Sequence, residues 1–119
     1  MKTHHEPLGS AAFLGEVLIE LARTIDARAG DDPDKSWTAK LLAGGPAVTA
    51  KKLGEEGVEA AIAIAHQSDK EVVNEAADVI YHLFVALRSR GVSLDQVGKA
   101  LQARQAKSGL EEKAGRPKE

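Results

Sequence analysis

Five acidic residues fall into two short groups whose spacing suits a metal site. Glu55, Glu56 and Glu59 follow the pattern Glu-Glu-x-x-Glu, and Glu75 and Asp78 follow Glu-x-x-Asp. Residues three apart share one face of a helix, so two antiparallel helices would bring four of these carboxylates together. Several carboxylates suit a hard cation such as Mg²⁺, with Mn²⁺ as an alternative, and Mg²⁺ keeps positions for water and substrate phosphates. The pattern therefore indicates phosphate-ester or phosphoanhydride chemistry.

A solvated surface is the alternative interpretation, because most glutamate-rich helix faces lie in solvent. Against it, apolar residues flank both acidic groups: on the first helix we expect Leu53, Ala60 and Ile64 to face the core. The second helix is apolar around most of its circumference, so its acidic stripe, which also includes His82, should lie in a groove. Like charges four residues apart destabilise a helix by about 0.2 to 0.5 kcal/mol per pair, so we expect a cation to offset them.

The elements that carry these groups are predicted to be helices. Apolar spacing, capping serines, glycines and prolines indicate helices over 10–29, 36–43, 46–66, 68–90 and 93–104, and no alternating strand pattern occurs. The predicted fold is an all-α bundle of four to five helices. We expect one domain over 10–105, a flexible arm over 1–9 and a disordered tail over 106–119.

Composition excludes several classes of protein. Sixteen basic and 18 acidic residues give a formal charge of −2, which is unlike the basic surface of a nucleic-acid binder. No cysteine is present, so disulfides, a thiolate nucleophile and cysteine-ligated zinc are excluded. No apolar run approaches the length of a membrane span or a secretory signal. We therefore expect a cytoplasmic protein that binds neither nucleic acid nor membrane.

Four segments together resemble a known enzyme family. "SWTAKLL", "KKLGEEGVEAAIA", "NEAADVIYHLFVAL" and "RGVSLDQV" occur in the order and spacing of the phosphoribosyl-ATP pyrophosphohydrolases, which belong to the MazG-like all-α nucleoside triphosphate pyrophosphohydrolases. The resemblance covers about residues 13–104. It implies Mg²⁺-dependent hydrolysis of the α,β-phosphoanhydride of phosphoribosyl-ATP, the second step of L-histidine biosynthesis. It also implies a MazG-like bundle that is completed by homodimerisation.

The resemblance also implies roles for individual residues. Glu56, Glu59, Glu75 and Asp78 would ligate the metal, and Glu55 or a ligand carboxylate would orient the attacking water. Substrate contacts are expected on three parts of the chain. For Trp37, packing in the core is favoured over contact with the substrate. The residues expected to contact substrate are Ser36, Trp37, Thr38, Lys40, Lys51, Lys52 and His82.

Two other functions stay open at this point. A housekeeping pyrophosphohydrolase for other (deoxy)nucleoside triphosphates would share the acidic groups but would not need the Ser-Trp-Thr segment. A non-catalytic helical dimerisation module would carry the acidic stripes as surface only. Substrate preference would distinguish the first alternative from phosphoribosyl-ATP hydrolysis. The effect of removing the carboxylates would distinguish the second from an enzyme.

Overall fold

The helices were located in a computed structural model, which describes residues 7–106 and Gly115. The all-α prediction is confirmed, because the described residues form helices and contain no strand. The predicted helices all occur, with ends that differ from the predicted ones by at most two residues. They are α1 (Ala12–Arg28), α2 (Trp37–Ala43), α3 (Gly45–His66), α4 (Asp69–Arg90) and α5 (Leu94–Gln105).

Local signals set most of the helix ends. Ser36, Ser68 and Ser93 each accept a backbone N–H in the first turn of α2, α4 and α5, and Gly91 ends α4 in the left-handed conformation. Ser10, the serine at the predicted start of the first helix, is not the N-cap of α1. Ala11 occupies the N-cap, and the Ser10 hydroxyl accepts the Ala12 N–H at 3.2 Å.

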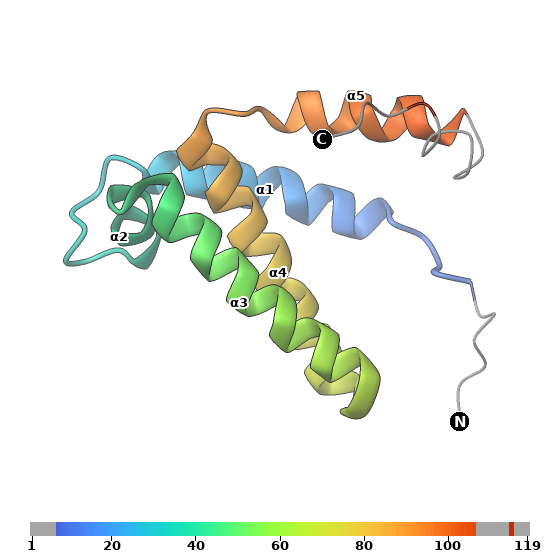
Figure 1. Ribbon diagram of the computed structural model, residues 1–119. Helices are drawn as coiled ribbons and strands as arrows, with labels where there is room; N and C mark the ends of the chain where they lie inside the picture. Colours follow the sequence, from blue (N-terminus) through green and yellow to red (C-terminus); the bar gives the residue numbers. More distant parts are fainter. Residues whose placement is uncertain (1–6, 107–114, 116–119) are drawn as a thin grey trace.

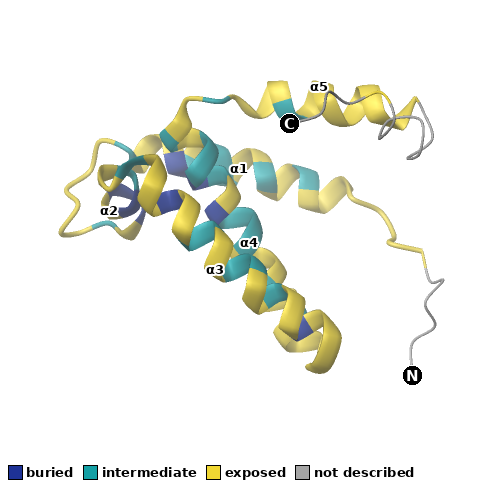
Figure 2. Cartoon of the chain, in the orientation of Figure 1, coloured by how far each residue is buried: buried dark blue, intermediate teal, exposed yellow. Residues whose placement is uncertain are grey.

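The long helices α3 and α4 form an antiparallel hairpin, and α1 and α2 pack at one end of it (Figure 1). The core lies at that end, where Ile25 of α1, Leu41 of α2 and Val85 of α4 are buried together (Figure 2). Towards its tip the hairpin is covered less, and most of its residues are exposed. The fold thus supports one end of the hairpin and leaves much of its length without a cover from the same chain.

Many large apolar side chains remain exposed. The prediction that Leu53, Ala60 and Ile64 hold α3 in the core is wrong for Ile64, which is 70% exposed, while the other two are half-buried. Thr49 and Ala63 are the buried residues of α3 instead. Because Val58 and Ile62 are exposed as well, α3 presents apolar surface to solvent on the side away from α4.

The remaining segments add little to the core. Helix α5 extends away from the hairpin, and none of its residues is buried (Figure 2). The predicted arm over 1–9 and tail over 106–119 lie mostly outside the described residues, so their boundaries stay predictions. Within the described part of the chain, no helix combines the length and apolarity needed to cross a membrane. The cytoplasmic location also stays a prediction.

Candidate active site

The centre of the site is an acidic cluster formed by Glu56, Glu75 and Asp78. Glu56 comes from α3 and the other two come from α4, and one carboxylate oxygen of each lies within 4.8 Å of the others. The antiparallel hairpin produces this meeting because it sets the middle of α3 beside the first half of α4. The predicted convergence of the two acidic groups therefore occurs for these three residues. The oxygens are close enough for one cation to bind them together.

Two oxygens of this cluster have no hydrogen-bond partner. Glu56 Oε2 and Glu75 Oε2 are shielded from solvent, and no described residue donates to either of them. A carboxylate oxygen removed from water normally has a donor, because leaving it without one is costly. The cluster therefore fits a cation better than it fits a solvated surface. The prediction that the acidic stripe of α4 is inset holds for Glu75, which is half-buried, and for His82, which is buried, but it is wrong for Asp78, which is exposed.

The proton affinity of both residues is raised. Burial is the largest effect on the pKa of Glu56 and lifts it above the ordinary value; the adjacent carboxylates of Glu59 and Asp78 raise it further, while His82 opposes them. Burial also raises the pKa of Glu75, and the charges of Glu59 and Asp78 add to the effect. Both shifts have the direction expected where carboxylates lie close together and lose hydration.

The other two glutamates of the first acidic group lie at the edge of the cluster. The Glu59 carboxylate is exposed and close enough to act on the pKa of both Glu56 and Glu75. Glu55 is exposed, and its carboxylate lies 3.9 Å from the Lys52 ammonium. Glu59 can thus join the cluster from its open side, whereas Glu55 points to a neighbouring lysine.

His82 lies one turn beyond Asp78 on α4 and is buried. Its Nδ1 lies 2.8 Å from the backbone oxygen of Asp78. Because a carbonyl oxygen only accepts, Nδ1 carries the proton and donates it, so in the neutral ring Nε2 has no proton. His82 thus has a fixed ring orientation and lies close enough to influence Glu56.

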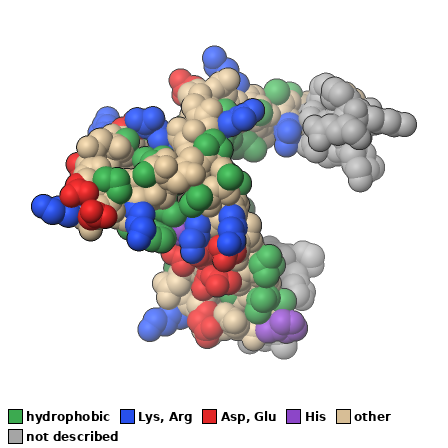
Figure 3. All heavy atoms as spheres, turned by 60° about the vertical axis from the view of Figure 1, so that its left-hand side comes forward, with side chains coloured by type: hydrophobic (Ala, Val, Ile, Leu, Met, Phe, Trp, Pro, Cys, Tyr) green, Lys and Arg blue, Asp and Glu red, His purple; other side chains and the backbone are tan. Residues whose placement is uncertain are grey.

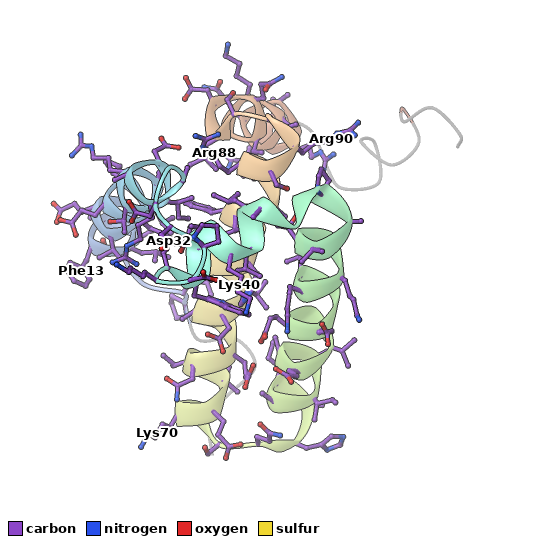
Figure 4. All side chains as sticks on the ribbon, turned by 90° about the vertical axis from the view of Figure 1, so that its left-hand side faces the viewer. Phe13, Asp32, Lys40, Lys70, Arg88 and Arg90 are labelled. Atoms are coloured by element: carbon purple, nitrogen blue, oxygen red, sulfur yellow. The ribbon has the colours of Figure 1, made fainter. Side chains whose placement is uncertain are left out.

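Lysines border the cluster. On one face of the molecule, Lys and Arg side chains form a row beside a group of Asp and Glu side chains (Figure 3). Lys40 extends from α2 toward the place where side chains of α3 and α4 meet (Figure 4), and Lys51 is exposed on α3. Lys52 is half-buried, and its ammonium lies 5.8 Å from the centre of the Trp37 ring. Lys40, Lys51 and Lys52, called the lysine row below, thus bring positive charge near the acidic cluster.

Trp37 is not a core residue. The favoured alternative of core packing is wrong, because the side chain is 52% exposed. Its neighbour Thr38 is the buried one, at 2% exposure, and its hydroxyl lies 2.6 Å from the Tyr81 hydroxyl of α4. The Ser36 hydroxyl accepts the Ala39 N–H, so this backbone donor at the start of α2 is already engaged. Of the three residues expected at this segment, Trp37 has the most exposed side chain, Ser36 is half-buried and Thr38 is buried.

The link between Thr38 and Tyr81 was not predicted from the sequence. A buried tyrosine hydroxyl usually has a hydrogen-bond partner, but the sequence around Tyr81 does not indicate which residue supplies it. The two residues are 43 positions apart, and the bond forms because α2 crosses α4 at this level. Tyr81 also contacts His82 edge to face, with ring centres 5.0 Å apart.

Comparison with known proteins supplies the family. Residues 18–105 match the phosphoribosyl-ATP pyrophosphohydrolase family. The chain belongs to this family. A phosphoribosyl-ATP pyrophosphatase of Ruegeria pomeroyi is 53% identical over 102 residues, which are 86% of this chain and 97% of the relative. Proteins of the same name from Cereibacter sphaeroides and Methylobacterium radiotolerans are 54% and 56% identical, over 84% and 83% of this chain and 97% and 92% of the relatives.

Family membership agrees with the resemblance of the four sequence segments. The matched range includes the acidic cluster, the lysine row, Trp37 and His82. As a member of the phosphoribosyl-ATP pyrophosphohydrolase family, the chain is a hydrolase that acts on acid anhydrides. The acidic cluster is where the described part of the chain concentrates groups suited to such chemistry.

Proposed function

We propose that the protein hydrolyses the α,β-phosphoanhydride of phosphoribosyl-ATP to phosphoribosyl-AMP and pyrophosphate, the second step of L-histidine biosynthesis. The observation that carries the proposal is the meeting of Glu56, Glu75 and Asp78 within 4.8 Å between α3 and α4. The relatives of this chain are named for this substrate, and the range that matches the family contains Glu56, Glu75 and Asp78. The acidic cluster and the adjacent lysines supply what a triphosphate needs, which is a cation site beside positive side chains.

We assign the metal site to Glu56, Glu59, Glu75 and Asp78, with Mg²⁺ as the expected ion and Mn²⁺ as the substitute. The unpartnered oxygens Glu56 Oε2 and Glu75 Oε2 support this assignment. Mg²⁺ bound there would neutralise the charge that develops on the pyrophosphate leaving group. The protein's own contribution is to hold the carboxylates in place on two helices, so that little reorganisation is needed when the substrate binds.

Phosphate contacts are assigned to the lysines that border the cluster. Lys52 is the principal candidate, since Trp37 and Glu55 restrain its ammonium, and Lys40 and Lys51 are further candidates. Among the remaining predicted contacts, Trp37 and His82 keep a substrate role, the first as an accessible ring and the second through Nε2. Ser36 keeps a role through its O–H group, because the Ala39 N–H occupies only an acceptor position of its oxygen, and Thr38 is withdrawn because Tyr81 engages its buried hydroxyl.

The attacking water needs a carboxylate to orient it. Glu55 is exposed at the edge of the site and has one cationic neighbour, Lys52. The alternative is a carboxylate of the acidic cluster itself. Substitution of Glu55 by Gln separates the two, since only the first assignment predicts a large loss of kcat.

A homodimer is proposed as the working form. The buried apolar core of one chain is small, and Val58, Ile62 and Ile64 of α3 are exposed along the hairpin. A second copy packed against the hairpin would cover this surface, as the apolar circumference of the two long helices requires. The proposal keeps the acidic cluster open on the side of the lysine row.

Substrate preference tests the proposed function. The purified protein would be assayed with phosphoribosyl-ATP and with a panel of dNTPs and ATP, each with Mg²⁺, and pyrophosphate release would be measured. We expect kcat/KM for phosphoribosyl-ATP to exceed that for every other nucleotide by at least about 100-fold, which is ~2.7 kcal/mol of discrimination. A higher value for any dNTP would assign the chain to nucleotide housekeeping instead. No turnover of any of them would favour a non-catalytic module.

A further inference from the structure

The hydrogen bond between Thr38 and Tyr81 joins α2 to α4 beside the acidic cluster. The two hydroxyl oxygens are 2.6 Å apart, and the threonine is almost fully buried. Tyr81 follows Asp78 by three positions, so the bond reaches α4 one turn beyond the cluster. The mechanism proposed above uses neither hydroxyl.

Helix α2 depends on such contacts for its position. It has only seven residues, and a helix this short is not stable alone. Ala39 and Leu41 bury its apolar side, and apolar contact is non-directional. A hydrogen bond is directional, so the Thr38 hydroxyl restricts the rotation of α2 about its own axis. That rotation sets the direction of the neighbouring Trp37 ring.

The Trp37 ring in turn holds Lys52. The lysine ammonium lies 5.8 Å from the ring centre, within the range of a cation–π contact, and 3.9 Å from the Glu55 carboxylate. A lysine side chain has four flexible bonds, and an unrestrained ammonium would spread over many positions. The ring is therefore the part of α2 that fixes where this positive charge lies relative to the cluster.

We propose that Thr38 and Tyr81 are positioning residues for substrate binding, whose hydrogen bond orients α2 so that Trp37 holds the Lys52 ammonium beside the acidic cluster. Neither hydroxyl touches the substrate in this arrangement. The inference rests on the proposed function, because it takes Lys52 as a contact for the substrate's phosphates. It adds two residues, one on α2 and one on α4, that act on Lys52 through Trp37.

The double variant Thr38→Val/Tyr81→Phe tests the inference. It removes both hydroxyls together and so leaves no buried partner unsatisfied, which preserves the fold better than either single change. We expect KM for phosphoribosyl-ATP to rise about tenfold while kcat changes less than about twofold, the pattern for loss of a contact made equally in ground and transition states. Thr38→Ser keeps the hydroxyl and should retain the wild-type KM.

Fluorescence of Trp37 gives a readout that does not depend on turnover. It is the sole tryptophan of the chain, so acrylamide quenching reports its surroundings alone. We expect quenching without substrate to become stronger in the double variant and to stay unchanged in Thr38→Ser. A purely structural role would lower the melting temperature without changing KM or quenching in the folded protein.

The chain offers a matched control in a second interhelical hydroxyl pair. Thr49 of α3 and Ser89 of α4 have hydroxyl oxygens 2.7 Å apart, and the threonine is again buried. Thr49→Val/Ser89→Ala should leave KM and quenching as in the wild type. An unchanged KM in the first double variant, or an equal rise in the control, would overturn the inference alone. A wild-type protein that fails to hydrolyse phosphoribosyl-ATP would overturn the proposed function and the inference with it.

Discussion

Glu56 of α3 and Glu75 of α4 face each other across the hairpin, with carboxylate oxygens within 4.8 Å. Each also has an oxygen that is shielded from solvent and accepts no hydrogen bond from the described residues. Two carboxylates in this relation repel each other and lose hydration, and both effects favour a bound cation. Without a bound metal, this repulsion should therefore lower the stability of the folded chain.

Replacing Glu56 by Gln should stabilise the metal-free protein. The change removes one like charge from the cluster, and we expect the melting temperature in EDTA to rise by roughly 1 to 3 °C, the size of losing one like-charge pair. Mg²⁺ should raise the melting temperature of the wild type and do so much less in the variant. Glu16→Gln, on the exposed side of α1, is the control and should change neither value. A destabilised Glu56→Gln protein would contradict the account.

The stability of the metal-free protein should also depend on pH through these two residues. Their pKa values are raised above 4.5, so the folded chain binds protons more tightly here than the unfolded chain does. The two charged carboxylates destabilise the folded chain fully when the pH is above their folded pKa values. This effect disappears as the pH falls through those values to 4.5. The difference in melting temperature between Glu56→Gln/Glu75→Gln and the wild type should shrink from pH 7.5 to pH 5. An equal difference at both pH values would exclude this cause.

Helix geometry explains why much of the acidic cluster could be predicted from the sequence. Residues three apart share a helix face, so the spacing of Glu75 and Asp78 fixed their side of α4 once the helix was identified. The meeting with Glu56 required only that consecutive long helices pack antiparallel, as the short connection at Ser68 favours. Capping residues gave the helix ends for similar local reasons.

The remaining features depend on contacts that spacing does not specify. Ile64 was expected in the core, but a helix that is apolar on several sides does not reveal which side its own chain covers and which side a second copy would cover. Trp37 was expected in the core but is exposed, and Thr38 was expected to contact substrate but is buried. Neither could be predicted, because the rotation of α2 follows from its contacts with α4. The bond to Tyr81 lies outside any local pattern.

Lys52→Met should weaken substrate binding more than Lys51→Met. Lys52 is half-buried against Trp37, whereas Lys51 is exposed, and methionine keeps most of the apolar stem of either side chain. We expect KM for phosphoribosyl-ATP to rise about tenfold or more for Lys52→Met and less than about threefold for Lys51→Met. Steady-state kinetics at fixed Mg²⁺ and ionic strength would measure both. Equal effects would remove the special role of Lys52.

The exposed apolar surface of α3 predicts a dimer that one charge can disrupt. In light scattering coupled to gel filtration, the wild type should have about twice the 12.6 kDa mass of one chain. Ile64→Glu should shift the mass toward that of one chain, because burying an unpaired carboxylate at an interface is costly. Leu8→Glu is the control, since Leu8 is fully exposed outside the helices. A monomeric wild type would contradict the proposed working form.

The most direct test of the metal-site account is the hydrolysis of phosphoribosyl-ATP by the wild type and by Asp78→Asn, each with saturating Mg²⁺ and with EDTA. The substitution keeps the size of a side chain in the acidic cluster and removes its charge. The account predicts turnover by the wild type that requires Mg²⁺, and a loss of at least about 100-fold in the folded variant. Turnover in EDTA, or a folded Asp78→Asn protein with the wild-type rate, would contradict it.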